Sequence, residues 1–426
     1  MAGHIQTQAV PDTANPITQA YKIRFVQETC NRLRGNLTSR NSGVSKKNAE
    51  DIKMGANGAQ TTIHALLAQA GVTINGDNAW DIRVHNKDLY SRLLSGGALA
   101  LGESYMDGWW DCESLDQFIF KILRAKLDQK VKGNYRLAWH VLKAKLFNLQ
   151  KPNRAYQVGE EHYDIGNDLY GAMLDKRMLY TCGYWAAVDN LDAAQEAKLD
   201  LVCRKINLEP GMTVLDLGCG YGSFAKYAAE RYGAQVTGVN VSKEQVELGA
   251  ELCRGLPVEL RLEDYRQITG KYDRVISIGI LEHVGYKNYR TYMQKADQCL
   301  KDDGIAFIHT IGNNVSSLTS NPWITKYIFP NGMLPSIAQI ARAMEGLFVM
   351  EDWHNFGQHY DKTLMAWHAN LEAAWPELNA KYGERFHRMF RFYLLSCAGA
   401  FRARNIQLWQ IVMTKPGRDC PDCRIS

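Results

Sequence analysis

Glu282 and His283 stand near the end of the segment ISIGILEHVG, directly after a run of small and apolar residues. A carboxylate without a partner in apolar surroundings is strongly unfavourable. Glu282 is therefore solvated, paired with another group or used in a reaction. His283 is interpreted as a structural or solvent-facing residue. Motifs elsewhere in the chain decide between the alternatives for Glu282.

A second chemical pattern is the glycine-rich segment VLDLGCGYGS, between a predicted strand and a predicted helix. Glycine permits positive φ and lets a ligand approach the backbone closely. A GxGxG spacing alone is compatible with a dinucleotide-binding fold or a tight turn. Asp216 precedes the first glycine, and Asn240 ends the next predicted strand, where many Rossmann-like proteins carry an acid for the ribose diol. An asparagine in place of this acid argues against binding of NAD or a flavin nucleotide. The loop resembles motif I of class I S-adenosylmethionine (SAM) methyltransferases, in which such an acid helps to hold the amino-acid end of the cofactor.

The elements that must position these residues alternate along the chain. TVLDLGCGYG has a strand pattern, SFAKYAAERYG a helix pattern, QVTGVNVS a strand pattern and KEQVELGAELCRGL a helix pattern; DRVISIGILE and GIAFIHTIG are further strands. Alternation of this kind predicts an α/β fold with a parallel, doubly wound sheet.

The length of 426 residues predicts two or three domains. Residues 1–60 are predicted to be a flexible extension, and residues 61–150 a smaller helical or α+β domain. Residues 151–414 are predicted to be the catalytic domain and 415–426 a tail. The tail contains CPDC, but a zinc site needs further ligands, so no metal is predicted.

The chain has no long apolar run and no signal-like N-terminus, and its ten cysteines lack a disulfide-like spacing. A cytoplasmic location is therefore expected. The net charge is +5, but between Lys121 and Arg154 ten basic residues stand against the single acid Asp128. This stretch is either a solvated helical face or a helix that docks on anionic lipid or nucleic acid. Without a recognisable nucleic-acid module, no nucleic-acid partner is expected.

Several long motifs in the same order resemble the cyclopropane-fatty-acyl-phospholipid synthases, a mycolic acid cyclopropane synthase-like family of class I SAM methyltransferases. They are EHYDIGNDLY with RMLYTCGYW, the glycine loop, ILEHVGYKNY, HTIG, KYIFPNGMLPS and EDWHNFGQHYDKTL. The likeness runs from about Ile63 to Thr414. It implies a Rossmann-like doubly wound sheet with a smaller N-terminal domain that binds lipid or membrane.

The resemblance implies transfer of the SAM methyl group to the cis double bond of an unsaturated acyl chain in a membrane phospholipid. Loss of a proton from the new methyl then closes a cyclopropane ring, with bound bicarbonate as the base. An alkene is a poor nucleophile that needs no deprotonation, so such an enzyme must mainly align it with the methyl group. The carbocation requires exclusion of water. The implied partners are unsaturated acyl chains and an anionic membrane surface at the inner face of the membrane; a homodimer is left open.

The resemblance also implies two sets of site residues. Backbone N–H groups of Cys182 and Ile311 and the side chains of His309 and Tyr360 would donate to bicarbonate, and Glu282 would accept its O–H and orient it. Cys182, His309 and Tyr360 could instead be packing or anchoring residues. Cys397 is a further catalytic candidate, with packing as the favoured alternative because alkene methylation needs no thiolate. The implied SAM contacts are Tyr180, Thr181, Asp216, Gly218, Gly220, Asn240, Val241, Gln245, Asp264 and Tyr265.

Three other functions remain open at this stage. An amine N-methyltransferase shares the HYDxGNDLY-like motif, although the basic N-terminal domain and KYIFPNG favour a large amphiphile. A second alternative is a related enzyme that methylates the acyl chain without closing a ring. The third is a non-catalytic lipid-binding protein on a methyltransferase fold.

Overall fold

The computed structural model describes residues 56–127 and 166–425 of the chain. Contacts between Cα atoms separate Met1–Gly58 from Ala59–Ser426, and the second unit contains all of the site residues. Most of the predicted extension and the predicted boundary near residue 150 lie outside the described residues, as does most of the basic stretch.

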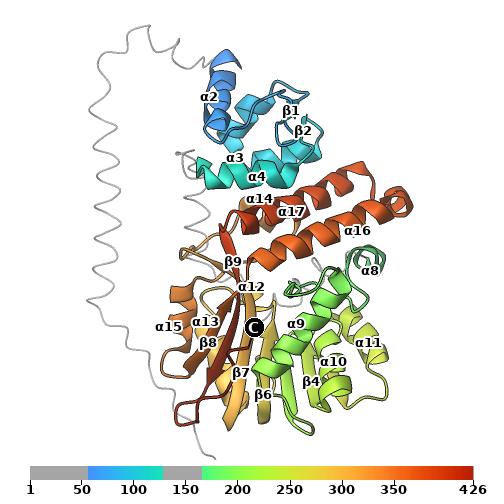
Figure 1. The fold of residues 1–426 in the computed structure, drawn as a ribbon, viewed down its shortest axis with the longest axis vertical. Helices are drawn as coiled ribbons and strands as arrows, with labels where there is room; N and C mark the ends of the chain where they lie inside the picture. Colours follow the sequence, from blue (N-terminus) through green and yellow to red (C-terminus); the bar gives the residue numbers. More distant parts are fainter. Residues whose placement is uncertain (1–55, 128–165, 426) are drawn as a thin grey trace, which may run out of the picture. The chain divides into compact units, whose positions relative to one another are not determined.

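The strands of the described residues form two sheets (Figure 1). The small antiparallel sheet consists of β1 (Arg83–Val84) and β2 (Trp110–Asp111). The large sheet has the order β5-β4-β3-β6-β7-β9-β8. Its strands are β3 (Thr213–Leu217), β4 (Gln235–Asn240), β5 (Val258–Leu262), β6 (Tyr272–Ile278), β7 (Leu300–Asn313), β8 (Val349–Asn355) and β9 (Ile406–Thr414).

Strands β3 to β7 are parallel, as the sequence predicts, whereas β9 pairs antiparallel with both β7 and β8. The difference arises from the connection between β8 and β9. It consists of the helices α16 (Gln358–Tyr382) and α17 (Glu384–Arg402), which turn back on each other at Gly383. A helical hairpin returns the chain to the edge that it left, whereas the single crossover helix of a βαβ unit carries it to the opposite edge.

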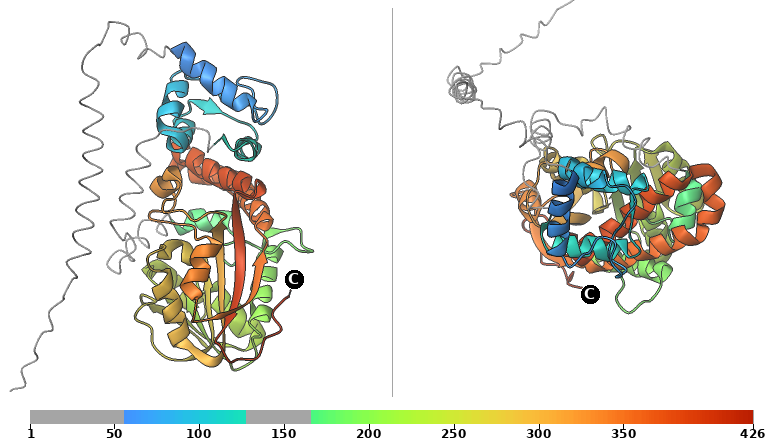
Figure 2. Two further views of the ribbon diagram at one scale, coloured as in Figure 1. Left: turned by 90° about the vertical axis from the view of Figure 1, so that its left-hand side faces the viewer. Right: turned by 90° about the horizontal axis from the view of Figure 1, so that it is seen from above.

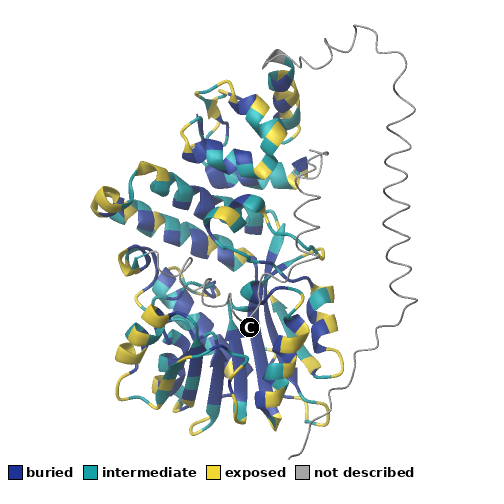
Figure 3. Ribbon diagram, turned by 180° about the vertical axis from the view of Figure 1, so that it is seen from behind, coloured by how far each residue is buried: buried dark blue, intermediate teal, exposed yellow. Residues whose placement is uncertain are grey.

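The two faces of the large sheet are covered by different helices, which confirms the doubly wound architecture. Alternate residues of β7 divide between the faces: Ala306 and Ile308 pack toward α13 (Tyr289–Cys299) and α15 (Ile337–Met344). Ile305 and Phe307 pack on the opposite face toward α9 (Leu191–Lys205) and α10 (Ser223–Tyr232). Figure 3 shows the strands of the sheet as mostly buried.

The remaining helices complete the unit. They are α2 (Ala56–Ala68), α3 (Leu89–Met106), α4 (Leu115–Arg124), α8 (Asn167–Met173), α11 (Lys243–Leu252), α12 (Leu281–Val284) and α14 (Pro322–Tyr327). Side-chain caps define several helix starts: Asn190 accepts from Ala193 N at α9, and Ser336 forms a capping box with Gln339 at α15.

Helices α16 and α17 form a layer above the carboxyl ends of the parallel strands (Figure 2). Helix α17 packs against α16 on one side and against α3 and α4 on another. Trp110, Phe118, Trp323, Trp367 and Phe390 belong to one buried cluster that joins this layer to the N-terminal helices. The N-terminal helices therefore share a hydrophobic core with the layer that covers the sheet.

Candidate active site

A cavity opens at the carboxyl ends of β3, β4 and β6, where open α/β sheets bind their ligands. All ten residues that the resemblance implies as SAM contacts line it, so the structure brings together segments spread over residues 180–265. They are Tyr180, Thr181, Asp216, Gly218, Gly220, Asn240, Val241, Gln245, Asp264 and Tyr265.

The glycine loop and Asp216 fit a polar ligand that approaches the backbone. Gly220 has φ +54°, and a Cβ atom there would meet nothing within 4 Å, so the position opens into space. Gly218 is required for packing instead, because a Cβ atom would lie 2.3 Å from Ile280 Cδ1. Asp216 is buried, and its Oδ1 has no hydrogen-bond partner among the described residues. Burial raises the pKa of this carboxyl to about 7, although the charge of Lys198 opposes the rise.

The Asn240 side chain is occupied by the loop itself. Its Nδ2 donates to Gly220 O at 3.2 Å and to Gln245 Oε1 at 2.7 Å, while its Oδ1 accepts from Val241 N and Ser242 N. Asn240 therefore connects the glycine loop to the start of α11. Its contact with SAM, which the resemblance implies, stays a prediction.

Two more of the lining residues have defined surroundings. Asp264 accepts from Arg266 N and forms an ion pair with Arg266 Nη1 at 2.7 Å. Tyr265 packs edge-on against Tyr292, and its buried hydroxyl has no hydrogen-bond partner among the described residues.

Lys198 is a residue of the site that sequence reasoning missed. It is fully buried on α9, and its Nζ donates to Thr181 Oγ1 at 2.9 Å. Burial lowers its pKa to about 8, against the raising effects of Asp175, Cys182 and Asp216. The available signal was its spacing: Ala194, Lys198 and Leu201 fall on one helical face, so Lys198 interrupts an apolar stripe.

His283, which was interpreted as structural or solvent-facing, lies in the wall of the cofactor cavity. Its ring lies 5.9 Å from that of Phe329, edge to face. Burial lowers its pKa to about 4, so the imidazole is neutral near pH 7. Tyr170, Leu174 and Met178 also line the cavity and were not among the predicted residues.

Glu282 occupies the first turn after β6, beside the end of β7. Only 8% of its surface is exposed, and its Oε1 accepts from Ile311 N at 2.6 Å. Its Oε2 is buried without a partner among the described residues. Burial raises the pKa of the carboxyl to about 7, and the Ile311 N–H opposes this rise. Of the three alternatives for Glu282, the structure excludes a solvated carboxylate, because the side chain is buried and one of its oxygens is paired with Ile311 N.

The Ile311 N–H, which the resemblance assigns to an anion, is occupied by Glu282 in this structure. His309 lies two residues earlier on β7, where it is paired with Ile278 of β6. Its Nδ1 lies 3.3 Å from Gln410 Nε2, and its Nε2 is buried without a partner among the described residues. Burial lowers its pKa well below the ordinary value, and the charges of Lys198 and Lys205 add to this effect.

Tyr360 lies buried on α16, close enough to the other candidates to be affected by their charges. Its pKa is raised by burial and then by Cys182, Glu282, Tyr180 and Cys397. The ring stacks on Phe401, with 4.6 Å between centroids. The structure therefore gathers Cys182, Glu282, Tyr360 and Cys397 in one region.

Cys182 is fixed by Thr363 of α16. Thr363 Oγ1 lies 3.9 Å from Cys182 Sγ, and it accepts from Gly183 N at 3.1 Å and from Trp185 Nε1 at 2.9 Å. Burial raises the pKa of the Cys182 thiol, and burial raises that of Cys397 to about 12. Neither thiol is disposed to form a thiolate near neutral pH.

Aromatic rings border the region next to Tyr180. The Tyr180 ring lies 5.2 Å from Tyr170 and 5.2 Å from Trp367, and its hydroxyl donates to Tyr393 Oη at 2.9 Å. Phe329 packs edge-on against Tyr393. Ring faces of this kind stabilise a nearby positive charge and exclude water.

The chain is similar to several known proteins. The mycolic acid cyclopropane synthetase family model matches residues 150–411. The Escherichia coli (strain K12) cyclopropane-fatty-acyl-phospholipid synthase is 53% identical over 350 residues, which cover 82% of this chain and 92% of that protein.

Solved structures are similar as well. The mycolic acid cyclopropane synthase CmaA1, complexed with SAH and CTAB, is 31% identical with a TM-score of 0.57, covering 61% of this chain and 98% of that one. Coclaurine N-methyltransferase, at 24% identity, has a TM-score of 0.60 and covers 74% of this chain and 99% of that one. This last likeness concerns the fold alone.

Proposed function

This chain belongs to the mycolic acid cyclopropane synthetase family and is a SAM-dependent methyltransferase, and we propose that it converts the cis double bonds of unsaturated phospholipid acyl chains into cyclopropane rings. The relative from Escherichia coli is named for this activity and is similar to the chain over most of its length. We further propose that bicarbonate accepts the proton that leaves when the ring closes.

The observation that carries the proposal is the pair of unpartnered polar atoms beside the cofactor cavity. Glu282 Oε2 and His309 Nε2 are both buried, and neither has a hydrogen-bond partner among residues 56–127 and 166–425. Unsatisfied buried polar groups are costly, so a small polar ligand that reaches both atoms would account for them. Bicarbonate fits because it has an O–H for the carboxylate and negative oxygens for the N–H of a neutral imidazole.

SAM supplies an electrophilic methyl group, and bicarbonate a base. In the transfer, the π electron pair of the alkene forms the new C–C bond and the S–C pair returns to sulfur. The rings of Tyr180, Trp367 and Phe329 would stabilise the positive charge that forms on the other alkene carbon. When the ring closes, a C–H pair of the new methyl forms the second C–C bond and the proton passes to the base. Glu282 orients this base, while the buried surroundings exclude water that would trap the cation.

The buried polar atoms of Glu282 and His309 support an amine N-methyltransferase less well than a cyclopropane synthase. Aromatic rings would suit an amine equally well. A free amine already carries its lone pair, however, and does not account for the pair of unpartnered atoms at Glu282 and His309. C-methylation of the acyl chain without ring closure uses the same machinery and must be separated by its product.

The test is to incubate the protein with SAM and vesicles of unsaturated phospholipid and to analyse the released fatty acids. Cyclopropanation adds CH₂ and removes the alkene, and proton NMR shows the strongly shielded ring methylene. A product with the same added mass that keeps an alkene would indicate methylation without ring closure. An inert lipid would contradict the proposed substrate, and a protein that fails to bind SAM in calorimetry would favour a lipid-binding protein.

We also propose that the protein reaches acyl chains from an anionic membrane surface. In the described residues, no helix is both long enough and apolar enough to cross a bilayer. The ten basic residues between Lys121 and Arg154 supply the electrostatic attraction, since each Lys or Arg near an anionic leaflet contributes about 1 kcal/mol. Of these, Lys121 packs its ammonium 4.3 Å from the Trp80 ring centre.

A further inference from the structure

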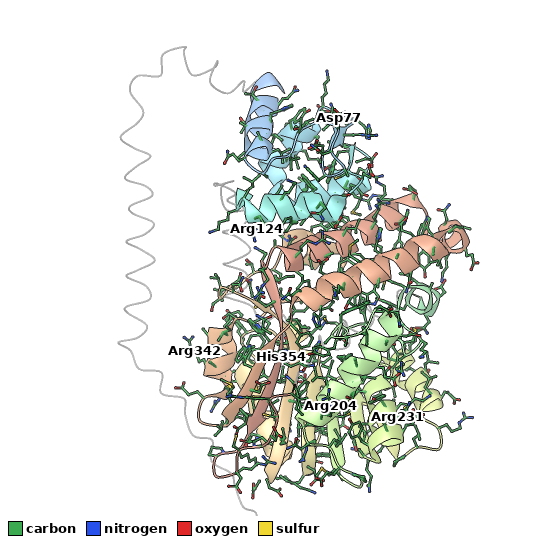
Figure 4. The ribbon with its side chains drawn as sticks, viewed as in Figure 1. Asp77, Arg124, Arg204, Arg231, Arg342 and His354 are labelled. Atoms are coloured by element: carbon green, nitrogen blue, oxygen red, sulfur yellow. The ribbon has the colours of Figure 1, made fainter. Side chains whose placement is uncertain are left out.

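Three polar side chains form a row across the sheet beside Glu282. Gln410 of β9 is directly opposite His309 of β7 on one side and His354 of β8 on the other. Side chains directly opposite on neighbouring strands point to the same face. His309 and Gln410 are both at least 99% buried. Figure 4 labels His354 on this row.

A buried lysine of α9 closes the row at its outer end. Lys205 Nζ lies 3.0 Å from His354 Nδ1 and 3.1 Å from Asp352 Oδ2. Because an ammonium group carries only donors, His354 must accept at Nδ1 and hold its proton on Nε2. The ammonium group of Lys205 therefore fixes the tautomer of His354, because it donates an N–H to the unprotonated Nδ1.

The same arrangement recurs at His309. Gln410 Nε2, which has two N–H groups and no lone pair to offer, lies 3.3 Å from His309 Nδ1. A neutral imidazole has one N–H, so donation to Nδ1 leaves the proton on Nε2. Two buried cations, Lys198 and Lys205, disfavour a second proton on the ring. With the Gln410 amide in this orientation, His309 is a neutral imidazole that carries its N–H on Nε2, a buried atom without a partner among the described residues.

We propose that Gln410 is a positioning residue that holds His309 in the Nε2–H tautomer, so that the ring presents a donor and not a lone pair to the anion beside Glu282. The inference rests on the proposed function for the identity of that anion. The opposite tautomer would aim a lone pair at a negatively charged oxygen, which repels it. A hydrogen bond to a charged group is worth about tenfold or more in binding, so losing this preference weakens anion binding by about that factor.

The tautomer can be measured directly. In the SAM-bound protein labelled with [¹⁵N]histidine, the two ring nitrogens of His309 give distinct ¹⁵N shifts, which His309→Asn assigns. We expect a protonated Nε2 and an unprotonated Nδ1. A proton on Nδ1, which would require the Gln410 amide to be turned over, overturns the proposal, and so does a doubly protonated ring.

The functional consequence is tested with Gln410→Met, which keeps length but removes the amide. We expect the KM for bicarbonate to rise about tenfold, with the KM for SAM unchanged. Gln407→Met is the matched control, since Gln407 is a buried glutamine on the same strand whose amide bonds Arg404 O and Asn355. An unchanged KM for bicarbonate in Gln410→Met, or an equal rise in Gln407→Met, overturns the assignment.

The two measurements distinguish failure of the bicarbonate hypothesis from failure of the role proposed for Gln410. If wild-type turnover does not respond to dissolved bicarbonate, the proposed base is wrong. The ¹⁵N shifts then decide by themselves whether Gln410 sets the tautomer of His309.

Discussion

Replacing Glu282 by glutamine should inactivate the protein and at the same time stabilise it at alkaline pH. The substitution keeps the shape of the side chain, and its Oε1 can still accept from Ile311 N. It removes the negative charge and the lone pairs of Oε2, which would hold the O–H of bicarbonate. Loss of this orientation should lower kcat by about 100-fold or more, with SAM affinity nearly unchanged because Glu282 does not line the cofactor cavity.

The magnitude of the stability effect follows from the pKa. Burial raises the pKa of Glu282 from 4.5 to about 7 in the folded protein. Between these values the folded state holds a proton that the unfolded chain has released, so this group makes stability fall as pH rises through the interval. Above pH 7 the loss is complete. At about 1.4 kcal/mol for each pKa unit, the rise of about 2.5 units amounts to about 3.5 kcal/mol.

Glutamine does not titrate, so the variant lacks this loss. Its buried Nε2 has no acceptor at the position of Oε2, which costs about 1–3 kcal/mol at every pH. The variant should therefore be less stable than the wild type near pH 4.5. Between pH 4.5 and pH 8, the free energy of unfolding of the variant should rise by about 3.5 kcal/mol relative to that of the wild type.

The assay is denaturant unfolding near pH 4.5 and near pH 8, together with turnover under limiting bicarbonate and SAM calorimetry. Glu377→Gln is the control, since Glu377 is an exposed residue of α16 and the change in charge is the same. Wild-type turnover in Glu282→Gln would refute the assignment of Glu282 to the base site. If wild type and variant had parallel pH profiles of stability, the reasoning from burial would be wrong.

Three further predictions concern other parts of the chain. Gly220→Val should abolish SAM binding in calorimetry. Gly211→Val should keep SAM binding, because Gly211 is another glycine with positive φ and open space around it, but it lies outside the cavity. Normal SAM binding in Gly220→Val would mean that the cofactor loop lies elsewhere. Cys397→Ser should keep turnover within about threefold, because a thiol whose pKa is about 12 is not a nucleophile at neutral pH, and a loss of about 100-fold would restore the nucleophile hypothesis. Activity should rise with the anionic lipid fraction and fall with added salt. Replacing Lys126, Lys130, Lys132 and Arg136 together by Glu should weaken sedimentation of the protein with anionic vesicles without changing its affinity for SAM. Equal sedimentation of variant and wild type at low salt would mean that the membrane contact lies elsewhere.

The sequence by itself determined the features that contiguous residues encode. The alternation of strands and helices predicted the doubly wound sheet, because the periods of the two elements differ locally. The glycine loop with Asp216 predicted the cofactor cavity, since these contiguous residues are part of its lining. Glu282 was recognisable as a functional candidate because a carboxylate directly after an apolar strand requires an explanation.

Only the tertiary structure decided which distant residues meet. Lys198 follows Thr181 by 17 residues and pairs with it because α9 packs on the face of the sheet beneath the loop. Gln410 meets His309 across 101 residues because the α16–α17 hairpin returns the chain antiparallel, so that β9 inserts between β7 and β8. Strand order and register are set by packing over the whole sheet and not by any local pattern. For this reason the sequence did not show which partners Lys198 and Gln410 would meet, whereas Asp216 and the glycines of one contiguous loop could be recognised.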